Sequence, residues 1–177
     1  MAESLDYARA LIREIPDYPL PEVRFQDVTP LLADGVAFDM IISALKPLAH
    51  TCDAIAGIEA RGFIFASALA QSLKLGFIPI RKAGKLPFHT FEEEYGLEYG
   101  SDRLQIHQDA LGVGKRVLLV DDVLATGGTA IAASKLVERL GAKIHGLAFV
   151  IEIAHLSGKA NLRRVFPDLP LTTLFTM

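Results

Sequence analysis

The chain has 177 residues, of which 51% are hydrophobic and 22% are charged, and its formal net charge is −3. This composition predicts one globular domain with a sound core, and it excludes a disordered chain and a general nucleic-acid-binding or membrane-binding surface. No apolar run is long enough for a membrane span, no charged-then-apolar leader opens the chain, and Cys52 is the single cysteine. We therefore expect a protein of the reducing cytoplasm, without intramolecular disulfides.

The N-terminal region predicts two helices separated by an extended segment. Apolar residues at helical spacing predict an amphipathic helix over residues 4–15, which a run of prolines ends. Residues 23–29 have the pattern of a short extended segment. Asp34 can then cap a second helix over residues 35–49. We expect residues 1–33 to form a small hood over the strand ends of the remaining chain.

A strand, a polar turn and a buried helix follow. Residues 54–58 predict a short apolar strand, and residues 63–73 are apolar nearly all round, as in a buried helix. The turn between them contains Arg61, whose planar guanidinium can bind phosphate oxygens in a bidentate manner. An ion pair between Arg61 and a neighbouring carboxylate is the alternative interpretation.

A third short strand, residues 76–80, leads into a basic segment. Arg81, Lys82 and Lys85 place three cations within five residues. Such a cluster suits an anionic ligand that carries two phosphates, although a solvated basic loop has the same composition. Residues 88–96 are polar, acidic and unpatterned, as in a lid, and the alternation over residues 104–107 predicts a strand and a hairpin.

Residues 116–130 carry the most informative pattern of the chain. Residues 117–120 form an unbroken apolar run of the kind found in a strand that is buried on both faces of a parallel sheet. Asp121 and Asp122 follow where that strand is expected to end. A glycine-rich turn then leads into a helix that Gly141 closes.

The turn predicts a phosphate cradle at the carboxyl end of the central strand, where the ligand crevice of an open parallel sheet lies. Glycines let backbone N–H groups converge, and the helix adds its positive dipole end. Thr126 and Thr129 can add hydroxyl donors and cap the helix. Because carboxylates repel phosphate but accept hydrogen bonds from vicinal hydroxyls, Asp121 and Asp122 favour a ribose 5-phosphate. The alternative, an ordinary strand-to-helix turn, leaves two buried aspartates without a role.

The remaining elements complete an α/β pattern. Residues 143–153 predict another strand, residues 156–164 a helix, and residues 171–175 a last strand. Strands that alternate with helices predict a parallel core sheet with right-handed crossovers, here formed by residues 34–177.

Residues 117–129 closely resemble the phosphoribosyl-pyrophosphate motif of type I phosphoribosyltransferases, and most resemble the members that act on adenine. The match extends to residues 57–65 and to the basic segment. The resemblance implies an α/β fold of the type I phosphoribosyltransferase kind, with a parallel core sheet flanked by helices, a small N-terminal hood and a flexible loop or hairpin. It also implies that adenine and phosphoribosyl pyrophosphate give AMP and pyrophosphate, with Mg²⁺ bound mainly through the substrate and no direct protein ligand. A homodimer is implied as well.

The same resemblance assigns residues to three parts of a site. The ribose 5-phosphate would be held by Asp121, Asp122, Ala125, Thr126, Gly127, Gly128 and Thr129. The pyrophosphate would be held by Ala60, Arg61, Arg81, Lys82 and Lys85. Adenine would lie near Arg24, Phe25 and Tyr99, with Glu98 as the catalytic acid or base near the purine nitrogens.

Two departures from the family pattern and four alternatives stay open. Gln26 stands where the family usually has an arginine, and Arg24 stands where an apolar residue is common, so the polar contacts to the base are not defined. Phe25 could equally be an ordinary apolar anchor, and Glu98 an exposed hairpin charge. Another base, namely hypoxanthine, guanine, xanthine or orotate, is the nearer alternative substrate. A sensor of phosphoribosyl pyrophosphate without turnover is the more distant alternative.

Overall fold

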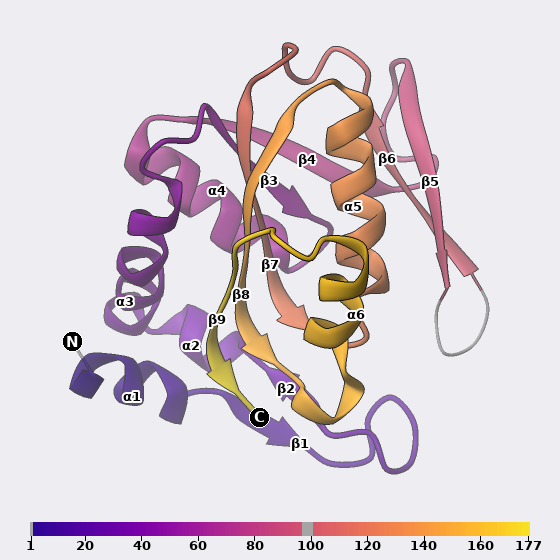
Figure 1. Cartoon of the computed structure of the whole chain (residues 1–177). Helices are drawn as coiled ribbons and strands as arrows, with labels where there is room; N and C mark the ends of the chain where they lie inside the picture. The colour runs from indigo at the N-terminus through magenta and orange to yellow at the C-terminus, as the bar shows by residue number, and fades with distance from the viewer. Residues whose placement is uncertain (1, 97–100) are drawn as a thin grey trace. The chain divides into compact units, whose positions relative to one another are not determined.

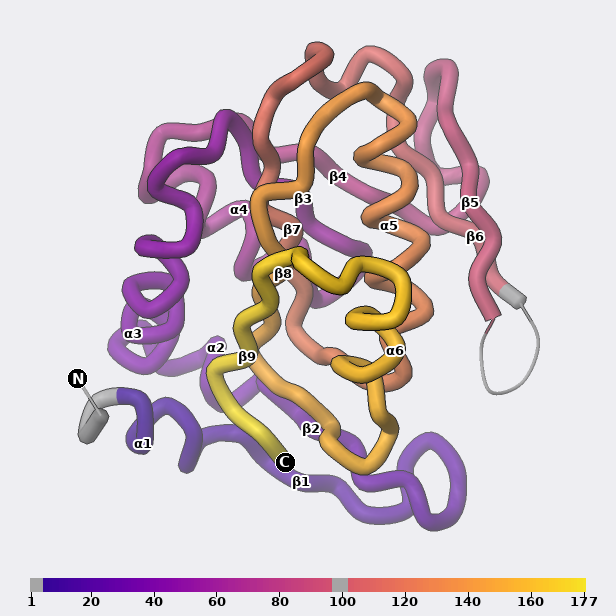
Figure 2. Tube along the Cα trace, in the orientation of Figure 1, coloured from indigo at the N-terminus to yellow at the C-terminus, as the bar shows by residue number. Residues whose placement is uncertain are grey.

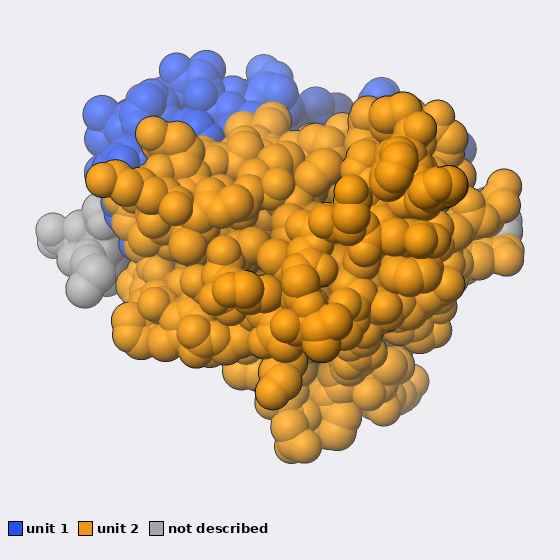
Figure 3. All heavy atoms as spheres, turned by 90° about the horizontal axis from the view of Figure 1, so that it is seen from above, with its two compact units in different colours: residues 1–45 blue, residues 46–177 orange. Residues whose placement is uncertain are grey.

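The structure, a computed structural model, describes the backbone of residues 2–96 and 101–177 and the side chains of residues 5–96 and 102–177. The chain divides into two compact units, residues 1–45 and residues 46–177 (Figure 3). Among the described residues, no helix combines the length and the apolar character that crossing a membrane requires.

The first unit consists of three helices and a two-stranded antiparallel sheet. In chain order these elements are α1 (Ala2–Ala10), β1 (Arg13–Ile15), β2 (Phe25–Asp27), α2 (Thr29–Ala33) and α3 (Gly35–Leu45). The expected cap of α3 is confirmed, because Asp34 Oδ1 accepts hydrogen bonds from the N–H groups of Val36 and Ala37, each at 2.9 Å. The helix ends before a 3₁₀ turn, η1 (Lys46–Ala49), since Pro47 has no N–H to continue the α-helical pattern.

The prediction of one helix over residues 4–15 is wrong at its C-terminal end. α1 stops at Ala10, and β1 follows instead. Pairing with β2 explains the difference, because Arg13 lies opposite Asp27 in the antiparallel register and its Nη2 lies 2.6 Å from Asp27 Oδ2. This tertiary pairing overrides a helical spacing that carries little free energy of its own. α2 was also not expected from the sequence.

The second unit is a seven-stranded sheet with helices (Figure 1). Its strand order is β5-β6-β4-β3-β7-β8-β9. The elements are β3 (Ala54–Ile58), α4 (Gly62–Leu73), β4 (Gly76–Lys82), β5 (Thr90–Gly96), β6 (Ser101–His107), β7 (Arg116–Leu124), α5 (Gly128–Arg139), β8 (Lys143–Glu152), η2 (Ala154–Leu156), α6 (Gly158–Val165) and β9 (Leu171–Thr176). The strands from β4 to β9 in this order are parallel, whereas β6 and β5 add an antiparallel edge. The predicted α/β fold with a parallel core sheet is confirmed.

The connections place the helices on opposite faces of the sheet. They also define a topological switch point, between β3 and β7, where the strand order reverses its direction. The chain moves from β3 through α4 to β4 in one direction across the sheet, and from β7 through α5 to β8 in the other. Right-handed crossovers therefore place α4 on one face and α5 on the other. α6 shares the face of α5, and the Cα trace shows these two helices side by side (Figure 2). The crevice at the carboxyl ends of β3 and β7 is thus the position where an open α/β sheet binds ligands.

The central strand is buried on both faces, as predicted, since Val117, Leu118, Leu119 and Val120 are each at most 2% exposed. It is, however, longer than expected. β7 continues to Leu124 because its ladder with β8 persists, with Asp121 opposite Phe149 and Leu124 opposite Glu152. The two aspartates therefore belong to the strand itself, which fixes their backbone.

The interpretation of residues 88–96 as an unpatterned segment is also wrong. Residues 90–96 form β5, which pairs with β6 along its whole length, from Thr90 opposite His107 to Gly96 opposite Ser101. Cross-strand contacts stabilise this acidic strand, since Glu92 Oε1 lies 2.7 Å from Arg103 Nη1. The predicted hairpin is present, whereas its flexibility stays a prediction.

Candidate functional site

The turn between β3 and α4 brings charged groups to the switch point. The peptide bond between Glu59 and Ala60 is cis, and α4 begins directly after Arg61. Gly62 is needed there, because a Cβ at this position would lie 3.1 Å from the Cα of Asp121 on the neighbouring strand. This close approach places Arg61 beside the acidic pair, with its Nε 2.6 Å from Asp122 Oδ2.

All four candidate cations for the pyrophosphate have carboxylate partners. Arg61 pairs with Asp122, so the alternative interpretation of this arginine describes an interaction that is present. Arg81 Nη2 and Lys85 Nζ lie 3.2 Å and 2.7 Å from the same atom, Glu59 Oε1. Lys82 Nζ instead lies 2.9 Å from Asp102 Oδ2. The basic segment is thus an ion-pair network rather than a solvated loop, and an anion that binds here must share these cations with carboxylates.

Glu59 is the centre of this network. Its side chain is 9% exposed, and it also accepts a hydrogen bond from the N–H of Lys82 at 3.0 Å. Burial acts to raise the pKa of Glu59, but the hydrogen bonds from Lys85, Arg81 and the Lys82 N–H outweigh it and lower this pKa to about 2. Glu59 therefore stays ionised at neutral pH and fixes the position of two cations.

The loop between β7 and α5 is held by backbone packing instead of charge. Gly127 has a φ of 87°, and a Cβ there would lie 2.9 Å from the carbonyl oxygen of Gly158. Asn161 Nδ2 donates to the Thr126 carbonyl oxygen at 3.0 Å, which fixes the direction of that peptide. Because the N–H groups in the first turn of an α-helix have no intrahelical acceptor, Gly128 and Thr129 offer donors to an anion.

The prediction that Thr126 or Thr129 caps α5 is wrong. The N-cap residue is Gly127, and no side chain caps the helix. Its left-handed backbone brings the glycine, rather than a hydroxyl, to the end of the helix. Thr126 and Thr129 are both half-buried. Because their hydroxyls do not cap the helix, they stay candidates for phosphate contacts.

The acidic pair lies between the turn after β3 and the loop after β7. Asp122 is 5% exposed and Asp121 is half-buried, and Asp121 Oδ1 accepts a hydrogen bond from the N–H of Asp122 at 2.9 Å. Burial and the neighbouring Asp122 carboxylate raise the pKa of Asp121 well above its usual range. Burial also raises the pKa of Asp122, although the Arg61 guanidinium acts in the opposite direction. Hydroxyl donors, or a positive charge nearby, would favour the ionised form of both.

The candidate residues for adenine are less well defined. Phe25 is half-buried and contacts Tyr18 edge to face, with ring centroids 5.2 Å apart. Arg24 is exposed and its Nη1 lies 3.3 Å from Glu14 Oε1. Glu98 and Tyr99 lie outside the described residues.

Sequence reasoning did not find several residues that shape the site. Glu59 lies in a turn for which the sequence predicts roles only at Ala60 and Arg61, and Gly158 and Asn161 lie in the helix predicted over residues 156–164, which has no predicted role. Tyr95 and Asp102 lie in the hairpin, where no motif marks them. The signal for Gly158 was weak, because its role depends on contact with Gly127, which is distant in sequence.

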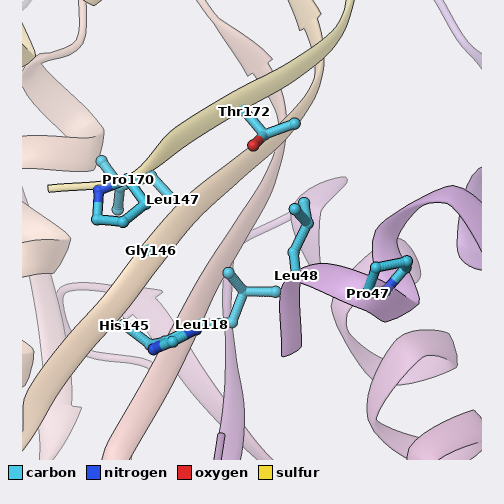
Figure 4. A pocket seen from close by; sticks show the side chains of 8 residues that line it. All are labelled: Pro47, Leu48, Leu118, His145, Gly146, Leu147, Pro170 and Thr172. Atoms are coloured by element: carbon cyan, nitrogen blue, oxygen red, sulfur yellow. The ribbon is translucent and has the colours of Figure 1, made fainter. Parts of the chain in front are cut away.

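A separate hollow lies on the sheet near the other end of β7 (Figure 4). None of the candidate site residues lines it. Its lining is mostly apolar and consists of Pro47, Leu48, Leu118, His145, Gly146, Leu147, Pro170 and Thr172.

Comparisons with known proteins identify the family of the chain. The family model of the phosphoribosyl transferase domain matches residues 32–168, so the chain belongs to the phosphoribosyltransferase family. Within that family, the relatives are adenine phosphoribosyltransferases. One, from Roseiflexus sp. (strain RS-1), is 52% identical over 156 residues, which cover 87% of this chain and 91% of the relative.

Solved structures give the same result. The crystal structure of adenine phosphoribosyltransferase from Rhodothermus marinus has a TM-score of 0.92 and 42% sequence identity, and the match covers 100% of both chains. The enzyme from Saccharomyces cerevisiae, complexed with adenine and an imino-altritol bisphosphate, has a TM-score of 0.91 and 37% identity, covering 98% of this chain and 99% of that chain. The predicted type I phosphoribosyltransferase fold is confirmed.

Proposed function

We propose that the protein transfers the 5-phosphoribosyl group of phosphoribosyl pyrophosphate to adenine, giving AMP and pyrophosphate. The observation that carries the proposal is the arrangement at the switch point: Asp121 and Asp122 lie between a glycine loop with helix N–H donors and a turn that presents Arg61. This order matches the order of phosphate, diol and pyrophosphate in the substrate. Similarity to adenine phosphoribosyltransferases, one of them solved with adenine, supports the choice of base.

In this mechanism, different residues stabilise the positive charge on the ribose and the negative charge on the pyrophosphate. The loop of residues 125–129 binds the 5-phosphate, and Asp121 and Asp122 accept hydrogen bonds from the ribose hydroxyls. As the anomeric C–O bond breaks, positive charge develops on the ribose near these carboxylates, and negative charge develops on the pyrophosphate near Arg61. Ala60, Arg81, Lys82 and Lys85 complete the proposed pyrophosphate site, with Glu59 fixing the cations.

Adenine activation is assigned to residues beyond this crevice. Glu98 is proposed as the group that shares a purine proton, a contribution typically worth about 100- to 10,000-fold in rate. Arg24, Phe25 and Tyr99 are proposed near the base. The support for these four residues is their match to the family motifs.

Mg²⁺ is part of the proposal, and the donor set fits a metal that arrives with its substrate. Among the described residues, no group of three or more His, Cys, Asp or Glu side chains could hold a metal ion. Mg²⁺ commonly keeps several waters and binds substrate phosphates, so we propose that it is held mainly through phosphoribosyl pyrophosphate, with no direct protein ligand. When bound, Mg²⁺ would neutralise charge on the phosphates.

The proposal also includes a homodimer, a small N-terminal hood formed by residues 1–33 over a core of residues 34–177, and a cytoplasmic location. The family resemblance supports the dimer and the hood. The single cysteine, Cys52, is buried and forms no disulfide, which supports a reducing compartment. Light scattering of the purified protein tests the dimer.

Pyrophosphate release tests the activity directly. The protein is incubated with phosphoribosyl pyrophosphate, Mg²⁺ and one base at a time. Release with adenine well above that with hypoxanthine, guanine, xanthine or orotate is the expected result. Faster release with another base would replace adenine, and binding without release for any base would favour a sensor.

A further inference from the structure

Lys82 differs from the other cations of the basic segment in its partner. Arg81 and Lys85 both pair with Glu59, on the turn that follows β3. The ammonium of Lys82, at the end of β4, pairs with Asp102 on β6. Its position therefore depends on the hairpin rather than on the turn.

Asp102 is itself held on both oxygens. Oδ1 accepts a hydrogen bond from the N–H of Arg103 at 2.8 Å. Oδ2, which lies 2.9 Å from Lys82 Nζ, also accepts a hydrogen bond from the Tyr95 hydroxyl at 3.3 Å. Tyr95 and Asp102 are directly opposed in the β5 and β6 register, so the two side chains lie on the same face. The carboxylate is thereby fixed in one orientation toward Lys82.

Tyr95 extends this arrangement to the glycine loop. Its side chain is buried, and the residue is 8% exposed. A Cβ at Gly128 would lie 3.9 Å from Tyr95 Cδ2 and 3.1 Å from the carbonyl oxygen of Gly96, so the end of β5 lies against the first turn of α5. The Thr129 hydroxyl also interacts with the Tyr95 hydroxyl.

Further contacts hold β5 along the rest of α5. Lys135 Nζ lies 2.9 Å from Glu93 Oε1, and Arg139 Nη1 donates to the Glu92 carbonyl oxygen at 2.6 Å. The Arg139 guanidinium also lies over the Phe91 ring, 4.6 Å from its centroid. The β5–β6 hairpin and α5, the helix that follows the glycine loop, therefore form one packed element.

We propose that Asp102 and Tyr95 are positioning residues for pyrophosphate binding: Asp102 holds the Lys82 ammonium in place, and Tyr95 ties this pair to the start of α5. The inference rests on the proposed function, because it assigns a role to Lys82 within that site. A lysine on a flexible four-carbon stem loses rotamer freedom when it binds an anion, and holding it in advance lowers this cost. The link through Tyr95 also connects the pyrophosphate side of the site to the phosphate loop.

A double-mutant cycle tests the coupling. Pyrophosphate affinity is measured by calorimetry for the wild type, Asp102→Asn, Lys82→Met and the double variant. Asp102→Asn should weaken binding about tenfold, the loss expected for a charged hydrogen bond. In the Lys82→Met background the same change should have little further effect, because its target is gone. Asp109→Asn, an exposed carboxylate in the turn after β6, is the control and should bind as the wild type does.

Tyr95→Phe refines the test because it keeps the buried ring. It should weaken pyrophosphate binding by less than Asp102→Asn and should add nothing in the Asp102→Asn background. The melting temperature of each variant should stay near that of the wild type. A lowered melting temperature with unchanged pyrophosphate affinity, or additive losses in either cycle, would show a merely structural role and overturn the inference.

The adenine-dependent release assay separates this inference from the proposed function. If the wild type binds pyrophosphate but releases none from phosphoribosyl pyrophosphate, the enzymatic function fails, while the cycle still decides the role of Asp102. If the wild type is active but the two variants are uncoupled, the function stands and the inference fails. Absence of pyrophosphate binding by the wild type would overturn the inference outright.

Discussion

The turn after β3 and the loop after β7 lie at neighbouring strand ends, yet they are built by different means. The turn depends on charged side chains: Glu59 fixes Arg81 and Lys85, and Arg61 pairs with Asp122. The loop of residues 125–129 depends on backbone geometry, through the left-handed Gly127 and its contact with Gly158. One element offers cations that already have partners, and the other offers N–H donors fixed by packing.

This difference suggests how the two ends of the substrate are treated. A backbone cradle cannot rearrange without moving α5 or α6, so it suits the 5-phosphate, which stays attached throughout the reaction. Ion pairs can exchange partners at small cost, so they suit a pyrophosphate that must leave. The comparison predicts that added bulk in the loop, and loss of charge at the turn, are the changes that lower activity.

The largest effect is expected for Gly127→Ala. The added methyl group would meet the Gly158 carbonyl, and the resulting shift of the loop should lower kcat/KM for phosphoribosyl pyrophosphate about 100-fold or more. Gly114→Ala is the matched control, because Gly114 also has a positive φ, 77°, but its Cβ would meet nothing within 4 Å. That variant should lose about 1–2 kcal/mol of unfolding free energy and keep its kinetic constants. Equal kinetic losses in both variants would remove the cradle from the account.

Asp122→Asn should have the next largest effect. The change removes a charged acceptor for the ribose hydroxyls and weakens the pair with Arg61, at about 1.5–3 kcal/mol for each charged hydrogen bond lost. Steady-state kinetics should show this as a fall in kcat/KM. Asp53→Asn is the control, since Asp53 lies before the start of β3 and pairs with Lys115. An unchanged kcat/KM for Asp122→Asn would exclude the diol assignment.

Glu59 gives a smaller effect that depends on pH. Its pKa is about 2 in the folded protein, below the value of about 4.3 for an unperturbed glutamate. A lowered folded pKa stabilises the protein above the unfolded value, and this contribution is lost as the pH falls from about 4.3 toward about 2. Glu59→Gln should therefore melt at a lower temperature than the wild type at pH 7, with the difference shrinking over this window. Thermal unfolding from pH 7 to pH 2.5 checks it, and a difference that is constant with pH would contradict the ion-pair explanation.

The sequence predicted the parts of this fold that depend on local pattern. The buried run at residues 117–120, the Asp34 cap and the order of strands and helices follow from periodicity and capping chemistry. What it missed depends on pairing with another strand. β1 exists because it pairs with β2, β7 extends through the aspartates because β8 continues beside it, and the acidic β5 is a strand because β6 supplies its cross-strand partners.

The candidate site shows the same division. Motif spacing brought Arg61 and the aspartates to one edge of the sheet, as expected for parallel strands. It did not indicate that every cation of the basic segment would have a carboxylate partner. Glu59 lies within the matched residues 57–65 but had no predicted role, and Asp102 lies in no motif. Only the folded strands place them against Lys85 and Lys82.

The backbone amide resonances of Gly127 and Gly128 give the most direct test of the proposed cradle. In NMR titrations of the labelled protein, ribose 5-phosphate should shift both resonances strongly, whereas pyrophosphate alone should shift mainly residues of the turn after β3. Such a separation would show that the two phosphate groups bind at the two elements described above. If ribose 5-phosphate left the two glycine amides unchanged, the 5-phosphate would not bind at this loop, and the central claim would be wrong.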